Sequence, residues 1–177
     1  QPADKGNSYV PAQIQKGSSI NKEEFDSLFS NAVETYKLAI KGDTEAVKKA
    51  IDLLKKLNVS DPQNHLVEAY YGCATSLLGR DLINPNDRFK YTMKGLKLLD
   101  HAVTSAPDDV QIRNLRASVC ARLPEMYFHK TETAVKDFNH ILSIFFKNNK
   151  CLSEEEFCQV LFDLGNCYKT LDRMDDA

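Results

Sequence analysis

The chain has 177 residues, of which 42% are hydrophobic and 27% are charged, and its formal net charge is −2. This composition is ordinary for a soluble globular protein and argues against disorder as the main state. The near-neutral charge gives no indication of nucleic acid or an anionic membrane as a partner. No apolar run approaches the roughly 20 residues of a membrane-spanning helix, so we expect no integral membrane segment.

Residues 1–20 and residues 21–177 differ in pattern. The first stretch holds two prolines and two glycines without sustained periodicity, which predicts an N-terminal tail or linker. From Asn21 onward apolar residues recur at three- and four-residue steps, which predicts one helical repeat domain over 21–177. No segment alternates long enough for a strand. The predicted fold class is therefore all-α, with about seven helices and the start of an eighth.

The helix starts are predicted from capping residues, prolines and breaks in the apolar pattern. Capping boxes open two of the helices, and Asp-Pro and Pro-Asp pairs open two more. A further helix is expected to begin after Asp172-Arg173. The seven complete helices are expected to start at or near Asn21, after Gly42-Asp43, at Asp61-Pro62, Asp87, Pro107-Asp108, Thr131 and Ser153.

An internal repeat surrounds Pro62 and Pro107, which are 45 residues apart. A small residue, a large residue and an apolar residue precede each proline at the same spacing. The small residue is expected where the two helices of a pair approach most closely, and the large one fills the space beside it. A third copy lacks the proline. The three sets are Ala50, Leu54 and Leu57; Gly95, Leu99 and Ala102; and Ala134, Phe138 and Ile141.

The final stretch, "LGNCYKTLDRMDDA", completes the resemblance to a known family. Leu161-x2-Leu164-Gly165-x2-Tyr168, followed by Ala177, is similar to the first half of the tetratricopeptide repeat motif. The resemblance covers about residues 25–177 and implies a right-handed α-solenoid of stacked helix pairs. The repeats here are longer than the family's unit of about 34 residues, and Thr75 and Glu68 stand where aromatic residues are expected. Ala177 would fall inside the second helix of a pair, so we expect the protein or domain to continue beyond it.

The resemblance also implies a concave groove that binds a peptide or a helix of another protein. The groove is lined by the first helix of each pair. Among its expected contacts, Tyr70, Asn114 and Asn166 are preferred, because an aromatic ring and two amides suit an extended backbone. The whole expected set is Tyr70, Gln111, Asn114, Ser118, Asp163, Asn166 and Lys169.

The insertion at 123–130 places Met126, Tyr127 and Phe128 in a predicted turn. We expect these side chains to pack back onto the helices. The alternative is that they are exposed and form an apolar patch that acts as an interface.

The cysteines and histidines show no catalytic or metal-binding spacing. The five cysteines form no C-x-x-C pair, and the four histidines are scattered, so we expect no metal site and no cofactor. Cys151 lies in a predicted loop and is the candidate exposed thiol. The absence of a disulfide framework favours a cytoplasmic protein. The alternative is an exported mature protein, because the chain starts at Gln1.

These patterns predict a non-catalytic scaffold or adaptor whose partner is a protein or peptide. One alternative is an assembly subunit that forms a homo-oligomer through an open C-terminal end. A second is a helical enzyme or cofactor-binding domain, which would need a pocket that joins a histidine to Cys151 or to a pair of carboxylates.

Overall fold

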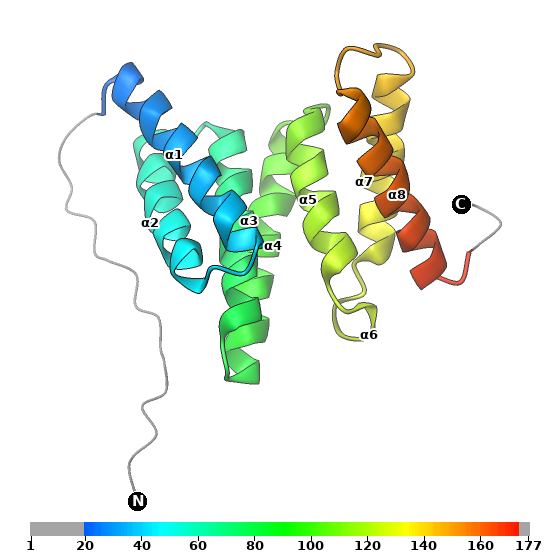
Figure 1. Ribbon diagram of the computed structural model, residues 1–177, viewed down its shortest axis with the longest axis horizontal. Coiled ribbons are helices and arrows are strands. Elements are labelled where there is room, and N and C mark those ends of the chain that lie inside the picture. Colours follow the sequence, from blue (N-terminus) through cyan, green and yellow to red (C-terminus); the bar gives the residue numbers. More distant parts are fainter. Residues whose placement is uncertain (1–19, 174–177) are drawn as a thin grey trace, which may run out of the picture. The chain divides into compact units, whose positions relative to one another are not determined.

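The computed structural model of the chain describes residues 20–173, and all regular secondary structure in this range is helical (Figure 1). The all-α prediction is confirmed. The predicted tail at 1–20 lies outside the described residues except for Ile20, and so does most of the predicted eighth helix, since the description ends at Arg173. The helices are α1 (Lys22–Ile40), α2 (Thr44–Ser60), α3 (His65–Asp81), α4 (Pro85–Ser105), α5 (Val110–Arg122), α6 (Glu125–Phe128), α7 (Thr131–Phe145) and α8 (Glu154–Thr170).

Two of the predicted helix starts are confirmed by their caps. The Asn21 side chain accepts a hydrogen bond from the Glu24 backbone N–H at 2.9 Å and begins α1. At α8 the Ser153 hydroxyl accepts from the Glu156 N–H, and the Glu156 carboxylate accepts from the Ser153 N–H, which completes a capping box. These caps satisfy backbone donors that the helix itself leaves unpaired.

The two predicted starts at prolines are wrong by a few residues, and in the same way. Asp61 ends α2, and α3 begins only after Asn64, whose side chain accepts from the Val67 N–H at 3.2 Å. Likewise α5 begins after Asp109, whose carboxylate accepts from the Ile112 N–H at 2.9 Å. Each proline therefore lies in the turn, and an amide or carboxylate two residues later supplies the cap.

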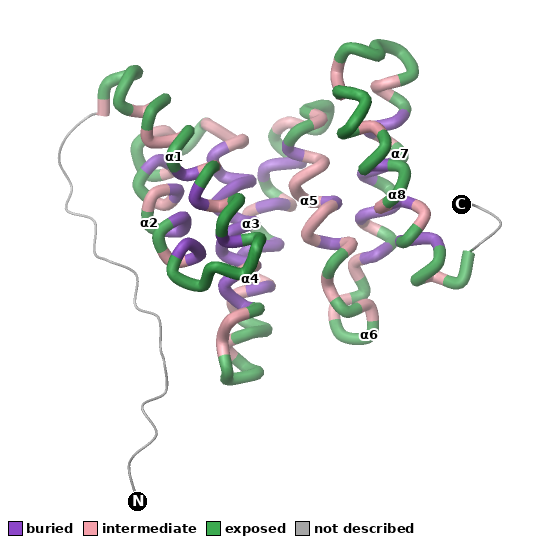
Figure 2. Tube along the Cα trace, in the orientation of Figure 1, coloured by how far each residue is buried: buried purple, intermediate pink, exposed green. Residues whose placement is uncertain are grey.

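The chain divides into two compact units, Gln1–Leu98 and Leu99–Ala177, with the boundary inside α4. In the first unit α1 and α2 pack against each other, and both contact α3. Figure 2 shows the buried residues on the inward faces of these helices. Ala50, Leu54 and Leu57 of the repeat are fully buried on α2, so the first copy of the pattern forms core, as predicted.

The close approach predicted at Gly95 is confirmed within the first unit. A Cβ atom on Gly95 would collide with the backbone carbonyl of Gly72 and with the Ser76 hydroxyl. The Ser76 hydroxyl also donates to the Thr92 carbonyl of α4 at 3.4 Å. The backbones of α3 and α4 come close here because Gly72 and Gly95 have no side chains, and the small Ser76 side chain fits beside them.

The second unit is built around the α5–α7 pair, with α8 packed on α7 and contacting α5. Phe138 and Ile141 of the repeat are fully buried on α7. The Asn139 amide donates to the Tyr168 hydroxyl at 3.0 Å and so connects α7 to α8.

A buried carboxylate also joins α5 to α7. Asp137 has no exposed surface, and its oxygens accept from Arg113 Nη1 at 2.6 Å and from Arg116 Nε and Nη2 at 2.7 and 2.8 Å. Arg116 also pairs with Asp100 at 2.9 Å. No sequence pattern predicted this network.

Within residues 20–173, no helix combines the length and the apolar character that crossing a bilayer requires.

Candidate partner-binding pocket

A pocket of about 420 Å³ lies in the second unit, where the N-terminal ends of α5 and α8 meet the loop before α8. Two of the predicted groove residues, Gln111 and Asn114, line it. The predicted loop thiol of Cys151 lines it as well and is half-buried. The full lining is Asp109, Val110, Gln111, Asn114, Cys151, Leu152 and Glu156. We call this the α5–α8 pocket.

Helix caps hold both carboxylates of the α5–α8 pocket in place. Asp109 caps α5 through its bond to Ile112. Glu156 accepts from the Ser153 N–H and from the Ser153 hydroxyl, each at 2.8 Å. These two hydrogen bonds, the backbone one first, lower the pKa of Glu156 below its ordinary value. The lining therefore includes a carboxylate that stays ionised and has a fixed orientation.

The pocket combines polar groups that suit a peptide backbone. Gln111 is exposed and Asn114 is half-buried, and an amide side chain is able to donate to a C=O group and accept from an N–H group of a peptide backbone. Val110 and Leu152 add apolar surface, and Asp109 and Glu156 add negative charge. This arrangement can bind an extended segment, or a basic side chain, of another protein.

The remaining predicted groove residues of α5 and α8 lie outside the pocket lining. Asn166 and Lys169 are exposed, while Ser118 and Asp163 are half-buried. Arg122 connects the two helices, because its guanidinium donates to the Ser118 carbonyl at 2.7 Å and lies 3.8 Å from the Asp163 carboxylate. The structure thus places Ser118 and Asp163 on adjoining helices, next to a shared arginine.

Tyr70 is placed differently from its prediction. It is only 8% exposed, and its ring packs edge-on against Phe29 and Tyr36 of α1, with centroid distances of 5.6 and 5.7 Å. An aromatic residue on the apolar side of a helix fills core space when a neighbouring helix is available. Tyr70 belongs to the core of the first unit, and the contact set proposed below excludes it.

The segment 123–130 contains the short helix α6. Met126 and Tyr127 are 77% and 70% exposed, and Phe128 is half-buried. The expectation that all three pack back is therefore wrong for Met126 and Tyr127, which are exposed, and their role as an interface stays a prediction. The Glu125 carboxylate accepts from the Thr131 N–H at 2.9 Å, which lowers the pKa of Glu125. This bond connects α6 to the start of α7.

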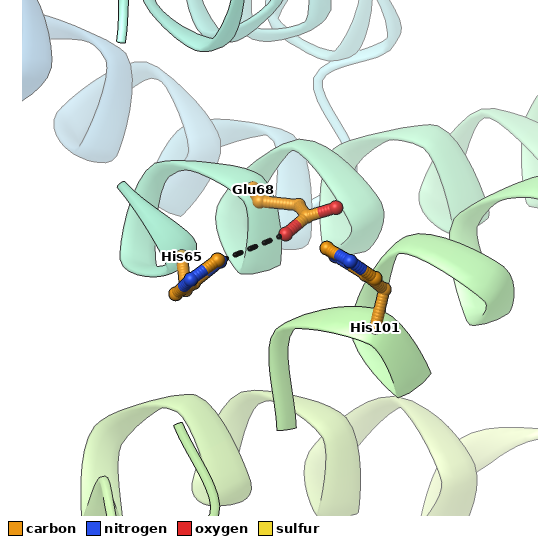
Figure 3. A group of neighbouring side chains, drawn as sticks. All are labelled: His65, Glu68 and His101. Atoms are coloured by element: carbon orange, nitrogen blue, oxygen red, sulfur yellow. Dashed lines mark hydrogen bonds and ion pairs between the residues drawn. The ribbon is translucent and has the colours of Figure 1, made fainter. Parts of the chain in front are cut away.

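Each of three histidines lies beside a carboxylate. His65 Nδ1 is 3.3 Å from Glu68 on α3 (Figure 3), and His140 Nε2 is 2.9 Å from Asp108. His129 Nδ1 is 3.6 Å from Glu125. Figure 3 also draws His101, which lies on the part of α4 that belongs to the second unit. Zinc sites take three or four protein ligands, so the pair on α3 does not make one by itself.

The fold and the α5–α8 pocket define a class: an all-helical protein of packed helix pairs with a polar surface pocket. Comparisons of the chain with models of known families, with curated proteins and with solved structures find no match. The tetratricopeptide resemblance gains no support from relatives and stays a prediction from the residues themselves.

Sequence reasoning missed four members of the pocket, Asp109, Val110, Leu152 and Glu156. Glu156 was predicted only as part of the capping box at Ser153, and no periodic signal marks the other three. The signal that could have found them is N-capping, since an N-cap residue places a carboxylate or hydroxyl at the N-terminus of a helix. The capped N-termini of α5 and α8 lie close together, so their capping groups line the same pocket.

Proposed function

We propose that the protein is a non-catalytic interaction scaffold that binds a peptide or helix of a partner protein at the α5–α8 pocket and along the adjoining polar surface of α5 and α8. One observation carries the proposal: two amides predicted as contacts, Gln111 and Asn114, line a pocket of about 420 Å³. Exposed Asn166 and Lys169 extend the polar surface along α8. The partner would be held by hydrogen bonds to its backbone at the pocket.

The pocket supports the enzyme alternative only in part. It joins Cys151 to two carboxylates, but none of its lining residues is a histidine, lysine or arginine. A cysteine nucleophile needs a base to take its proton or a nearby cation to stabilise the thiolate. The interaction scaffold therefore explains the lining better than nucleophilic catalysis does.

A library of displayed peptides tests the proposal. Peptides selected on the wild-type protein are labelled, and their dissociation constants are measured by fluorescence anisotropy for wild type and for the Gln111→Ala, Asn114→Ala double variant. Two lost hydrogen bonds are expected to weaken binding by at least about tenfold. Failure to select any peptide, or unchanged affinities in the double variant, would refute the pocket assignment.

The matched control is Asn86→Ala, which removes an exposed amide from the first turn of α4 in the first unit. Its peptide affinities are expected to equal those of the wild type. Thermal unfolding of all variants separates lost binding from lost folding, because Gln111 is exposed and Asn114 is half-buried, and their truncation is expected to change stability little.

A further inference from the structure

Helix α4 carries three lysines along one side of its exposed surface. Lys90, Lys94 and Lys97 follow one another at steps of four and three residues, and all three are exposed. Because successive residues turn by about 100°, the three side chains leave the helix within an arc of about 60°. Thr92 and Leu96, which are 5% and 1% exposed, lie on the other side of the helix. We call the three residues the α4 lysine stripe.

Like charges adjoin along the α4 lysine stripe. Lys94 has Lys90 one turn before it and Lys97 one turn after it, and like charges at such spacings destabilise a helix. Within residues 20–173 none of the three lysines forms an ion pair, and Lys90 lies instead over the ring of Tyr91, 6.0 Å from its centroid. The helix therefore carries a repulsion that no described side chain relieves.

Both carboxylates of α4 lie outside the stripe. Asp87 is half-buried in the first turn, where the helix dipole favours a negative charge. Asp100 follows Lys97 by three residues, but it pairs with Arg116 at 2.9 Å. Neither carboxylate is placed to balance the lysines.

The lysines of α2, in the same unit, are arranged differently. Lys48 forms an ion pair with Glu45 at 2.9 Å. Asp52 lies three residues before Lys55 and four before Lys56, which are favourable spacings for opposite charges on a helix. Alternating charge of this kind is typical of a solvated helix face. The α4 lysine stripe lacks this balance, and an anionic partner would supply it.

The stripe fits the carboxylates of a protein better than a nucleic acid or a membrane. From Lys90 to Lys97 it spans only about 10 Å of helix, whereas DNA-binding proteins commonly contact about 6–10 phosphates. The chain has a net charge of −2, so the residues outside the stripe are more negative still and repel a long polyanion. A helix that docks on a membrane surface needs exposed apolar side chains beside its charges, and the stripe contains none.

We propose that the α4 lysine stripe binds an acidic segment of a partner protein, whose Asp and Glu side chains pair with Lys90, Lys94 and Lys97. This surface is separate from the α5–α8 pocket, whose lining residues all belong to the second unit and include two carboxylates. The stripe attracts acidic groups and the pocket attracts basic ones. The two proposals therefore concern different ligands, and each has its own test.

Titration of the ¹⁵N-labelled protein with an acidic peptide, followed by NMR, tests the stripe. The probe is a short peptide in which every second residue is glutamate, and the control peptide has glutamine at each of those positions. Only the acidic peptide is expected to shift the backbone amide signals around Lys94. Exposed ion pairs are individually weak and are screened by salt. We therefore expect a dissociation constant of about 0.1–1 mM at low salt and weaker binding as the salt concentration rises.

Charge reversal at the centre of the stripe gives the sharpest comparison. Lys94→Glu is expected to weaken binding of the acidic peptide by at least about fivefold, because it removes one attraction and adds a repulsion. The matched control is Lys56→Glu, which reverses another exposed lysine of the first unit and should bind within about twofold of the wild type.

Thermal unfolding separates lost binding from lost folding. Lys94→Glu places a carboxylate one turn from Lys90 and from Lys97, which replaces two repulsions with two attractions on the helix surface. Its melting temperature is therefore expected to equal or exceed that of the wild type, although its binding is weaker.

Three outcomes would overturn the proposal. The first is an acidic peptide that shifts no signal of α4. The second is equal weakening by Lys94→Glu and Lys56→Glu, which would show a response to the overall charge of the protein. The third is tighter binding at α4 of a single-stranded DNA with the same number of charges, or of vesicles that contain phosphatidylserine. That result would make a nucleic acid or a membrane the ligand of the stripe.

Discussion

The two units hold their helix pairs together by different contacts. In the first, α3 and α4 meet through Gly72 and Gly95, with backbone against backbone. In the second, α5 and α7 are joined by the buried carboxylate of Asp137 and two arginines. The repeat pattern is the same at both places, since Leu99 and Ala102 follow Gly95 at the same spacing as Phe138 and Ile141 follow Ala134. A shared pattern of small and large residues therefore specifies helix pairs without specifying the chemistry that joins them.

The largest expected effect comes from removing Asp137. Asp137→Ala leaves the guanidinium groups of Arg113 and Arg116, which are only 14% and 15% exposed, without their carboxylate. Breaking a buried pair in this way is expected to destabilise the second unit by about 3–5 kcal/mol. Urea denaturation followed by circular dichroism measures it.

Asp100→Ala is the control for Asp137→Ala. Its carboxylate side chain is 47% exposed and pairs with Arg116 at 2.9 Å. A pair this exposed is expected to contribute less than about 1 kcal/mol. If the two variants lose equal stability, burial does not distinguish the two carboxylates. Asp137 would then not be the main link between α5 and α7.

A smaller effect is expected at the glycine crossing of the first unit. Gly95→Ala puts a methyl group against the Gly72 carbonyl, which is backbone and moves only if a helix moves. Overpacking of this kind costs about 1–3 kcal/mol. Thermal or urea unfolding of the variant measures the loss.

The chain supplies a matched control at Gly165, whose added methyl group would meet no atom of the described residues outside its chain neighbours and its own helical backbone. Gly165→Ala is expected to be neutral or to stabilise α8 by up to about 1 kcal/mol, because alanine is the better helix former. Equal destabilisation by both changes would contradict the close approach in the first unit.

The sequence predicted what depends on local pattern. The helical period and the caps at Asn21 and Ser153 follow from residues within a few turns of each other. The close approach at Gly95 follows from the repeated spacing of small and large residues before Pro62 and Pro107. The starts at Pro62 and Pro107 were placed too early, because proline fixes a turn as readily as a first helical position, and the polar residue two positions later provides the better cap.

Contacts between residues far apart in the sequence could not be predicted from it. Arg113 and Arg116 are separated from Asp137 by 24 and 21 residues, and charges with such spacing read as a solvated surface. Tyr70 was assigned to the groove because the repeat places it on a first helix, yet α1 covers it. For the pocket, the sequence supplied Gln111 and Asn114, and Glu156 joined them only through the packing of α8 beside α5.

The smallest expected effect concerns the acid sensitivity of the second unit. Hydrogen bonds from Ser153 lower the pKa of Glu156, so its charged form stabilises the folded state. That contribution is complete at pH 7. It declines as the pH falls toward the ordinary glutamate value of about 4.3, and it is lost once Glu156 is protonated in the folded state as well. Because Glu156 is exposed to solvent, we expect only about 0.5 kcal/mol, from the capping charge at a helix N-terminus.

Glu156→Gln separates this charge from the geometry of the cap, because the glutamine oxygen can still accept from the Ser153 N–H. The variant is expected to be less stable than wild type at pH 7 and equal to it near pH 3, as measured by urea denaturation at a series of pH values. A constant difference at all pH values would assign the effect to packing. A stability difference that grows as the pH falls would have the wrong sign for a lowered pKa. Glu156 would then not act as a fixed, ionised carboxylate in the α5–α8 pocket.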